Sequence, residues 1–216
     1  MPVWELDDEL WFPPVEMAEE DGLLAFGGDL NVRRLLLAYN RGIFPWTCDE
    51  GPHLWWSPDP RFVLFPERLK VSKSMQQVLK KGIFEYRYDT AFDQVIRNCA
   101  TSTRKGNPGT WISEEIVESY TKLHHLGIVH CAESWKDGEL VGGLYGLRLG
   151  NAFFGESMFS KESNASKAAF INLVRQLQSE GVKLIDCQMH TEHLESLGGE
   201  YISRKVFMEA LEYLIH

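Results

Sequence analysis

Two carboxylates and one amide lie in segments whose other residues are mostly apolar. In KLIDCQMH, residues 183–190, Asp186 stands among leucine, isoleucine, cysteine and methionine, and Gln188 follows two positions later. In AFFGESMF, residues 152–159, Glu156 has the apolar residues Phe154 and Met158 two positions away on either side. A carboxylate is costly to remove from water, so each acid needs either a partner or a chemical task.

Both segments have the pattern of β-strands, in which alternate side chains share a face. By this alternation Asp186 and Gln188 share a face and stand roughly 7 Å apart along it. Phe154, Glu156 and Met158 share a face of the other strand by the same rule. One such Asp is readily explained as a paired structural group, whereas two acids on nearby strands favour a polar floor in an apolar pocket.

The composition is that of an ordinary globular protein. The chain has 216 residues, 44% hydrophobic and 25% charged, enough for one large domain or a domain plus a small subdomain. The net charge of −9 argues against nucleic-acid or membrane binding by global charge, although it leaves room for a local basic patch.

We find neither a signal peptide nor a membrane span of roughly 18 apolar residues. The scattered cysteines predict buried thiols in a cytosolic protein.

The first 61 residues are rich in aromatic residues, proline and glycine, whereas regular helix and strand patterns follow. This change predicts a small N-terminal domain over 1–61 and a larger domain over 62–216. The first part contains one clear helix, 31–40, and three tryptophans and four prolines crowd residues 42–61, which argues against regular structure there. The second part reads as helices, a three-strand meander over 128–159, an amphipathic helix, a strand and a final helix. This order predicts an α+β fold with a mixed sheet.

The motifs WWSPDPR, GTWI, LVGGLYG, FGESMFS, NASK, LIDCQ and SLGG, in this order, strongly resemble those of the leucyl/phenylalanyl-tRNA–protein transferases. The resemblance runs from about residue 23 to the last helix, and the two ends of the chain depart from the family pattern. It implies transfer of Leu, Phe or, less readily, Met from aminoacyl-tRNA to the N-terminal Arg or Lys of a protein, which marks the acceptor for N-degron degradation. It also implies a GNAT-like acyltransferase domain with a small N-terminal domain, and neither metal nor soluble cofactor. We expect a cytoplasmic monomer without membrane contact.

The residues fit this chemistry. The donor ester is already activated, and the acceptor amine has to lose a proton and be aimed at the ester carbonyl. The resemblance points to Asp186 and Gln188 beside the amine, with Asp186 orienting and polarising Gln188. In a competing mechanism the enzyme only aligns its substrates and the terminal ribose hydroxyl carries the proton. Glu156 has two possible tasks, gripping the cationic side chain of the acceptor or holding the amine of the aminoacyl group, and a charge pair inside the sheet is the structural alternative.

The resemblance also assigns substrate contacts. Tyr39, Trp46 and Trp111 match the positions that the family uses to stack the 3′-terminal adenosine, and core packing is the alternative for Tyr39. The amino-acid pocket is predicted to be lined by Met158, Phe153 and Ile185. Alternation points the last two away from the acids unless a bulge intervenes. For the tRNA body, the basic candidates are Arg33, Arg34, Arg41, Lys80 and Lys81.

Three other interpretations deserve weighing. The histidines of HHLGIVHC, residues 124–131, cross a helix end into a strand, which is poor spacing for a metal site. An acyl-CoA-dependent N-acetyltransferase is the main alternative, but it needs a glycine-rich pyrophosphate loop, and SKESNASK after Phe159 contains no glycine. A non-catalytic RNA-binding module would require a strongly basic chain.

Overall fold

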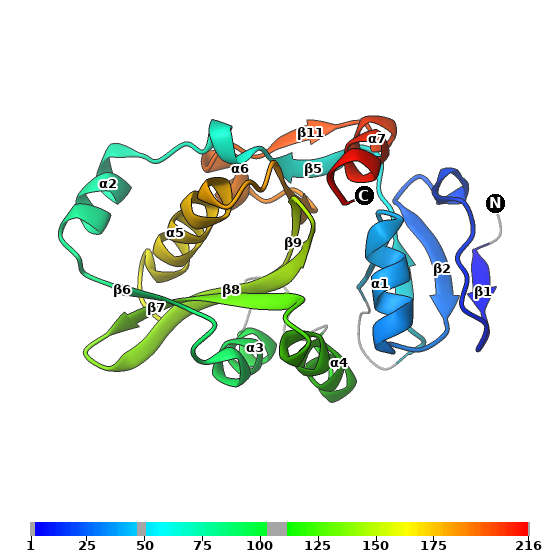
Figure 1. Cartoon of the computed structure of the whole chain (residues 1–216), viewed down its shortest axis with the longest axis horizontal. Coiled ribbons are helices and arrows are strands. Elements are labelled where there is room, and N and C mark those ends of the chain that lie inside the picture. Colours follow the sequence, from blue (N-terminus) through cyan, green and yellow to red (C-terminus); the bar gives the residue numbers. More distant parts are fainter. Residues whose placement is uncertain (1–2, 47–50, 103–111, 216) are drawn as a thin grey trace.

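The computed structural model describes residues 3–46, 51–102 and 112–215, which form two mixed sheets with helices around them (Figure 1). The small sheet has the order β1-β2-β4-β3. Its strands are β1 (Trp4–Leu6), β2 (Leu23–Gly27), β3 (Phe44–Pro45) and β4 (Leu54–Trp56). The large sheet has the order β11-β5-β10-β9-β8-β7-β6. Its strands are β5 (Arg61–Leu64), β6 (Glu85–Tyr88), β7 (Val129–Lys136), β8 (Glu139–Leu149), β9 (Ala152–Ser160), β10 (Leu184–Gln188) and β11 (Glu200–Ile202).

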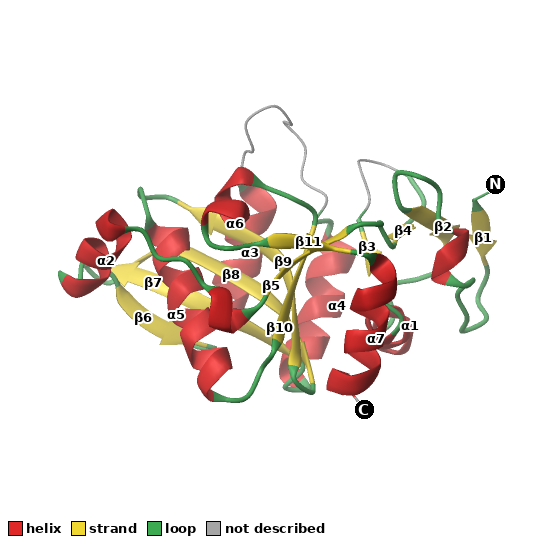
Figure 2. Cartoon of the chain, turned by 90° about the horizontal axis from the view of Figure 1, so that it is seen from above, coloured by secondary structure: helices red, strands yellow, loops and turns green. Residues whose placement is uncertain are grey.

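The helices begin where the sequence supplies caps. Asn31, Ser72 and Ser113 each accept a hydrogen bond from the backbone N–H three residues later, which stabilises the first turn of a helix. The long amphipathic helix α5 and the short α2 lie over one face of the large sheet, with α3 and α4 on the other (Figures 1 and 2). The α-helices are α1 (Val32–Asn40), α2 (Lys73–Lys80), α3 (Phe92–Thr101), α4 (Glu114–His125), α5 (Ala165–Ser179), α6 (Glu192–Ser196) and α7 (Arg204–Ile215). Two 3₁₀ turns, η1 (Val15–Met17) and η2 (Pro66–Arg68), complete the structure of the described ranges.

The predicted α+β class, the meander of β7, β8 and β9 and the helix and strand that follow it are confirmed. The prediction of no regular structure over 42–61 is wrong, because β3 and β4 both lie there and pair with each other. The small sheet ends at Trp56 and the large sheet begins at Arg61. We keep a division near residue 61 as a proposal, with Arg61 itself in the large sheet.

The C-terminal helix α7 joins the two sheets. It packs against the turn that follows α1, and this turn requires glycine. Gly42 has a φ of +66°, and a Cβ at this position would lie 2.6 Å from the sulfur of Met208. At the start of α7, the Arg204 backbone N–H donates to Asp59 and its guanidinium donates to the Ser57 carbonyl. These contacts fix the connection between β4 and β5 against α7.

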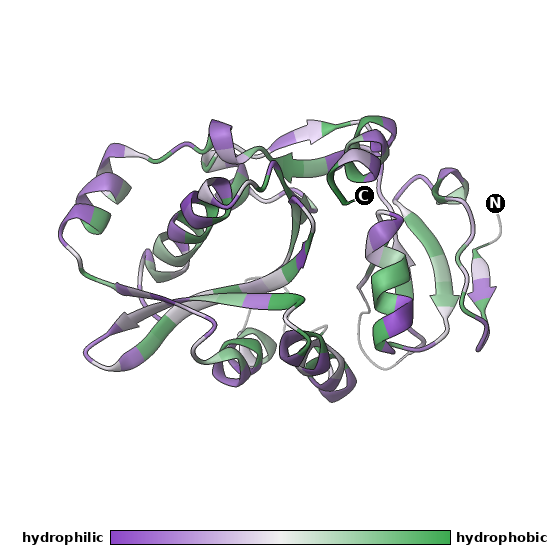
Figure 3. Cartoon of the chain, viewed as in Figure 1, coloured by the Kyte–Doolittle hydropathy of each residue, from purple (hydrophilic) through white to green (hydrophobic). Residues whose placement is uncertain are grey.

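The pairing of β9 with β10 stops before either strand ends. Leu184–Asp186 pairs in parallel with Ala152–Phe154, but β9 continues to Ser160 and β10 to Gln188. Beyond this point the strands separate, and each carries an irregularity there. Figure 3 shows hydrophobic stretches in β5 and β8, whereas α4 is largely hydrophilic. Within the described ranges, no helix is long and apolar enough to span a bilayer.

Candidate active site

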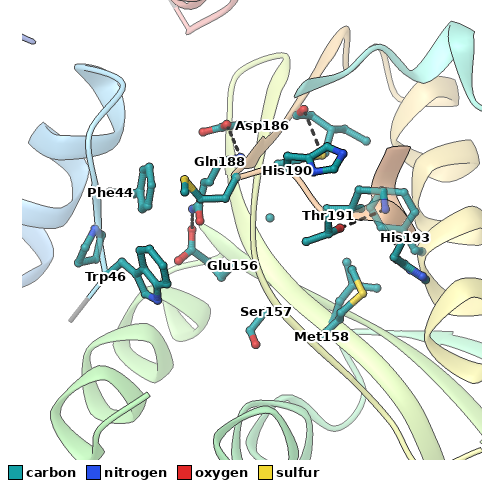
Figure 4. Close-up of a pocket in the computed structure, with 18 residues that line it drawn as sticks. Phe44, Trp46, Glu156, Ser157, Met158, Asp186, Gln188, His190, Thr191 and His193 are labelled. Atoms are coloured by element: carbon teal, nitrogen blue, oxygen red, sulfur yellow. Dashed lines mark hydrogen bonds between the residues drawn. The ribbon is translucent and has the colours of Figure 1, made fainter. Parts of the chain in front are cut away.

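A pocket of about 480 Å³ opens where β9 and β10 separate. Its volume lies in the range of small-molecule sites. Phe44 and Trp46 form one wall from the small domain, β9 supplies Glu156 and Met158, and Gln188 lies at the end of β10 (Figure 4). The pocket is thus built by both domains and holds two of the three polar residues predicted for the chemistry, with the third, Asp186, in its lining behind them.

Gln188 and Glu156 face each other across the centre of the pocket (Figure 4). The Gln188 Nε2 donates to Glu156 Oε1 over 2.8 Å, and the Tyr120 hydroxyl donates to Glu156 Oε2 over 3.1 Å. Behind them, the Tyr120 and Tyr39 hydroxyls lie 2.5 Å apart. With its NH₂ group held by Glu156, the Gln188 amide presents its oxygen as the atom that can accept a hydrogen bond from a substrate.

Glu156 ionises with difficulty in these surroundings. Burial raises the pKa of its carboxyl to about 8, and the negative charge of Asp186 acts in the same direction. Burial likewise raises the pKa of Tyr39 and of Tyr120 well above the ordinary phenol value, so both hydroxyls stay neutral. A cation that enters the pocket will favour the ionised form of Glu156 and be attracted to it.

The raised pKa predicts an unusual pH dependence of stability. Between about pH 4.5 and pH 8 the folded protein holds a proton on Glu156 that the unfolded chain has released, so this group makes stability fall as pH rises through that window. We expect Glu156→Gln to lose this slope and to be the more stable protein at pH 8, by up to about 4 kcal/mol on the scale of 1.4 kcal/mol per pKa unit. Urea unfolding of both proteins at pH 5, 6.5 and 8 measures the effect, and equal slopes would show that burial does not perturb Glu156.

Asp186 is fully buried and paired. Its two carboxylate oxygens accept hydrogen bonds from Arg61 Nε at 2.8 Å and Arg61 Nη2 at 2.7 Å. Its Oδ1 also accepts the backbone N–H of Gln188 at 2.9 Å. The predicted link between Asp186 and Gln188 is therefore present, but it runs through the backbone of Gln188 and not through its side chain.

Bulges change the faces that strict alternation predicts. Tyr145 of β8 pairs with Ser157 and Gly146 pairs with Gly155, so Glu156 is an extra residue in β9. Placing Met158 on the face of Glu156 is therefore wrong. Met158 instead packs in the same apolar cluster as the other two residues predicted for the amino-acid pocket, Phe153 and Ile185. Met158 and Ile185 line the pocket, whereas Phe153 is not part of its lining and lies in the core of that cluster.

Of the three aromatic residues predicted to stack on the 3′-terminal adenosine, only Trp46 is found in the pocket lining among the described residues. Trp46 lines the pocket and packs against Trp56, with ring centroids 5.7 Å apart. Tyr39 is fully buried, and its ring packs against Phe154 while its hydroxyl joins the chain behind Glu156, so the structure offers no face of it to an adenine. Trp111 lies outside the described residues.

Of the five basic residues predicted to contact tRNA, four are exposed and one is buried. Arg33 and Arg41 are exposed near α1, and Lys80 and Lys81 are exposed at the end of α2. Arg34 is fully buried, and its guanidinium donates to Asp29 and to the Asp7 carbonyl within the small domain. Its assignment to tRNA is corrected on that ground: a buried side chain cannot reach a phosphate.

Sequence reasoning missed three residues of the site. Arg61 and Tyr120 hold the two acids, from positions 125 and 36 residues away along the chain. His193 lines the pocket at the end opposite Trp46 (Figure 4), and its Nε2 is buried without a partner among the described residues. Burial and the nearby Lys167 ammonium lower the pKa of His193. No spacing rule would have linked these positions.

A further buried acid and the histidine-rich segment serve local structure. Glu133 accepts the backbone N–H groups of Thr90 and Ala91 at the start of α3, so it stabilises that helix end. His124 bonds the Val129 carbonyl through Nδ1, and His130 bonds Asp89. In the described part of the chain, no group of three or more His, Cys, Asp or Glu side chains is arranged to hold a metal ion.

Comparison with known proteins identifies the family. A family model described as "Leucyl/phenylalanyl-tRNA protein transferase" matches residues 63–212, and the model of the corresponding N-terminal domain matches residues 28–59. The chain belongs to the leucyl/phenylalanyl-tRNA–protein transferase family. A transferase of that name from Syntrophobacter fumaroxidans is 54% identical over 211 residues, 98% of this chain and 90% of its own. One from Flavobacterium johnsoniae is 53% identical over 210 residues, 97% of this chain and 99% of its own.

Membership of this family makes the protein an aminoacyltransferase with aminoacyl-tRNA and protein substrates. The match of a separate N-terminal family model confirms the predicted small N-terminal domain. Solved structures similar to the chain include a GCN5-related N-acetyltransferase-like protein from Streptococcus suis, with a TM-score of 0.37 and 16% identity over 66% of this chain and 59% of that one. They also include L-PGS from Bacillus licheniformis, with a TM-score of 0.45 and 12% identity over 89% of this chain and 73% of that one.

Proposed function

We propose that this enzyme transfers Leu or Phe, and less readily Met, from aminoacyl-tRNA to the N-terminal Arg or Lys of acceptor proteins. The observation that supports it is the order of groups in one pocket. Trp46 stands at one end with the Gln188–Glu156 pair near it, and Met158 lies farther along the pocket (Figure 4). Leu144, Phe170 and Ile185 add further apolar lining. This order suits an adenosine, an ester with two amines nearby, and an apolar amino-acid side chain.

In the reaction, the acceptor nitrogen forms a bond to the ester carbonyl carbon and the bond from that carbon to the ribose oxygen breaks. The acceptor ammonium first releases one proton to solvent. The neutral amine then loses a second proton and the ribose oxygen gains one, so no further reactant is needed. The Gln188 amide oxygen accepts an N–H hydrogen bond from the attacking amine. This bond orients the amine so that the lone pair of its nitrogen points at the ester carbonyl carbon. A neutral amide is a weak base, so we propose that Gln188 orients the amine and that the terminal ribose hydroxyl carries the proton to the leaving oxygen.

Glu156 supplies negative charge in the same place once a substrate cation enters and favours its ionised form. Its carboxylate lies 2.8 Å from Gln188 Nε2, and it is only 8% exposed, so an ammonium that reaches it is held in a desolvated setting. We propose that Glu156 binds a substrate cation, either the acceptor side chain or the amine of the aminoacyl group. Glu156→Gln separates these tasks, because it raises the KM for Arg-peptide in the first case and the KM for Leu-tRNA in the second.

The proposed function is tested by a transfer assay. Labelled Leu-tRNA and a peptide with N-terminal Arg are incubated with the enzyme, and acetyl-CoA with the same peptide is run in parallel. We expect leucylated peptide and no acetylated peptide, and a peptide with N-terminal Ala serves as the acceptor control. Acetylation without leucylation would establish the acyl-CoA-dependent N-acetyltransferase in place of this proposal. Because charged tRNA is the donor and the product carries an N-degron, we place the reaction in the cytoplasm and upstream of protein degradation.

The tRNA body is expected to rest on local basic residues of an acidic protein. Arg33 and Arg41 lie near α1 and the lysines near α2, at opposite ends of the molecule (Figures 1 and 2), so a single tRNA has to reach along the protein to touch both groups. We expect Lys80→Glu with Lys81→Glu to weaken tRNA binding and to reduce the slope of log affinity against log salt by about 1 to 2, from loss of one or two phosphate contacts.

The measurement is tRNA affinity by fluorescence anisotropy between 50 and 200 mM salt. Lys183→Glu with Lys205→Glu is the matched control, since both lysines are exposed and the change in net charge is the same. If the control pair reduces the slope as much as the α2 pair, only global charge matters and the α2 patch is not a tRNA contact.

A further inference from the structure

Arg61 is the first residue of β5 and is 1% exposed. Its Nε and Nη2 donate in parallel to the two oxygens of Asp186, over 2.8 and 2.7 Å. Two parallel charge-assisted bonds fix both the position and the rotation of the Asp186 carboxylate. Lysine, with a single ammonium on a flexible stem, cannot reproduce this geometry.

The carboxylate that Arg61 fixes holds the backbone of Gln188. Asp186 Oδ1 accepts the Gln188 N–H over 2.9 Å, and Gln188 has a φ of +62°, in the left-handed region that side chains other than glycine rarely adopt. The register of β10 against β5 shifts at the same place. Since the backbone angle sets where the Gln188 side chain points, the aim of its amide into the pocket depends on Asp186 and, behind it, on Arg61.

Arg61 also supports the opposite wall of the pocket. Its guanidinium lies over both the Phe44 ring and the Phe207 ring, each with a distance of 4.7 Å to the ring centroid. Phe44 is part of the wall that the small domain contributes beside Trp46, and Phe207 belongs to α7. One side chain therefore contacts Asp186 of β10, Phe44 of the small domain and Phe207 of the C-terminal helix.

Stability alone gives a weak reason for such a pair. A buried ion pair gains from attraction about what it loses in desolvation, and apolar side chains of similar volume often serve a fold as well or better. Arg61 carries a further cost, because its Nη1 is buried without a hydrogen-bond partner among the described residues. The ion pair provides a carboxylate of fixed orientation that accepts the Gln188 backbone N–H, and apolar residues cannot provide this acceptor.

We propose that Arg61 is a positioning residue for aminoacyl transfer, which fixes Asp186 and through it the left-handed backbone that aims the Gln188 amide at the reacting amine, while its faces hold the Phe44 wall. The inference rests on the proposed role of Gln188. It also assigns Asp186 to positioning, because both oxygens of that buried carboxylate already accept hydrogen bonds and neither is exposed to a substrate amine.

The test compares Arg61→Lys with wild type in steady-state transfer of Leu to an Arg-peptide. We expect kcat to fall by about 10- to 100-fold, the scale of a misplacement of roughly 1 Å, with the KM for Leu-tRNA changed less than threefold. Glu133→Gln is the matched control, since Glu133 is an equally buried charged group that lies outside the pocket. It is expected to lower thermal stability while leaving kcat unchanged.

A second measurement asks whether Arg61 acts through Gln188. In a Gln188→Ala background, Arg61→Lys should cause no further loss of kcat, whereas an independent structural effect would lower kcat by the same factor in both backgrounds. Such an equal factor, or a folded Arg61→Lys protein with the wild-type kcat, would overturn the inference. Wild-type protein inactive on the Arg-peptide would instead contradict the proposed function, and an active Gln188→Ala would remove Gln188 from it.

If Arg61→Lys does not fold, the double variant Arg61→Met with Asp186→Leu takes its place. Removing both partners leaves no unpaired charge, so this variant is expected to fold. It should transfer at least 100-fold more slowly than wild type. Transfer at the wild-type rate by this folded apolar variant would show that the pocket needs neither member of the pair.

Discussion

Replacing Asp186 with alanine is expected to lower the rate of aminoacyl transfer by about 100-fold or more. The variant loses the acceptor of the Gln188 N–H, so the left-handed backbone at Gln188 is no longer held and its amide is no longer aimed. It also leaves the Arg61 guanidinium buried without its counter-charge, which is expected to reduce stability by about 3–5 kcal/mol. Binding of aminoacyl-tRNA should stay nearly intact, because Asp186 lies behind the pocket surface.

The experiment measures kcat, donor affinity and urea stability for Asp186→Ala and for the control Glu133→Gln, at a temperature where both proteins are folded. Glu133 is also buried and accepts hydrogen bonds from the N–H groups at the start of α3, so its loss affects stability without affecting the pocket. Near-normal transfer by a folded Asp186→Ala protein would remove this residue from the mechanism.

The buried acids show how far the sequence leads. Asp186 is a carboxylate in an apolar strand, for which the sequence allowed either a structural pairing or a chemical task, and the structure shows the pairing. It is a paired structural group, in an ion pair with Arg61, and that pair stands directly beneath the pocket. Its partner could not be predicted, because Arg61 lies 125 residues away in a segment with the local pattern of a turn. Long-range pairing leaves no periodic signal.

The pocket residues show a second limit. Alternation predicts faces well where strands are regular, but a bulge of one residue reverses every face beyond it. The extra residue at Glu156 moved Met158 to the side of Phe153 and Ile185, so the set that the family resemblance suggested is brought together by an irregularity that the pattern does not reveal. Helix caps, by contrast, are local chemistry, because the Asn31 and Ser113 side chains each accept the backbone N–H only three residues later.

The small domain shows a third limit. The sequence offered Arg34 as a basic contact for tRNA. In the structure Asp29 and the Asp7 carbonyl bind its guanidinium, so Arg34 becomes a buried anchor of the domain. Tyr39 lies on the apolar face and is buried, as the packing alternative held, yet its hydroxyl reaches the polar centre through Tyr120.

Donor selection is expected to follow the branching of the amino-acid side chain. Leu and Phe branch at the γ carbon, whereas Ile and Val branch at the β carbon, close to the ester. The apolar side chains of Leu144, Met158, Phe170 and Ile185 line the same pocket as Gln188 and Glu156. We therefore expect a β-branched donor to clash where the pocket has to hold the ester. A difference of one methyl position in such a pocket corresponds to about 1–3 kcal/mol, so we expect Leu-tRNA to be used roughly 10- to 200-fold more efficiently than Ile-tRNA.

A variant with an enlarged pocket also tests whether pocket shape selects the donor amino acid. Met158 lines the pocket, and Met158→Ala removes part of the apolar wall. The variant should lose more activity with Leu-tRNA than with Phe-tRNA, since the larger ring still reaches the remaining walls, and Met-tRNA should stay the weakest of the three accepted donors. The measurement is kcat/KM for matched charged tRNAs at subsaturating concentration. Leu and Ile side chains are isomers of equal volume, so only a pocket that is narrow beside the ester can discriminate between them. Equal kcat/KM values for Leu-tRNA and Ile-tRNA with the wild-type enzyme would therefore show that the pocket does not distinguish β- from γ-branched side chains.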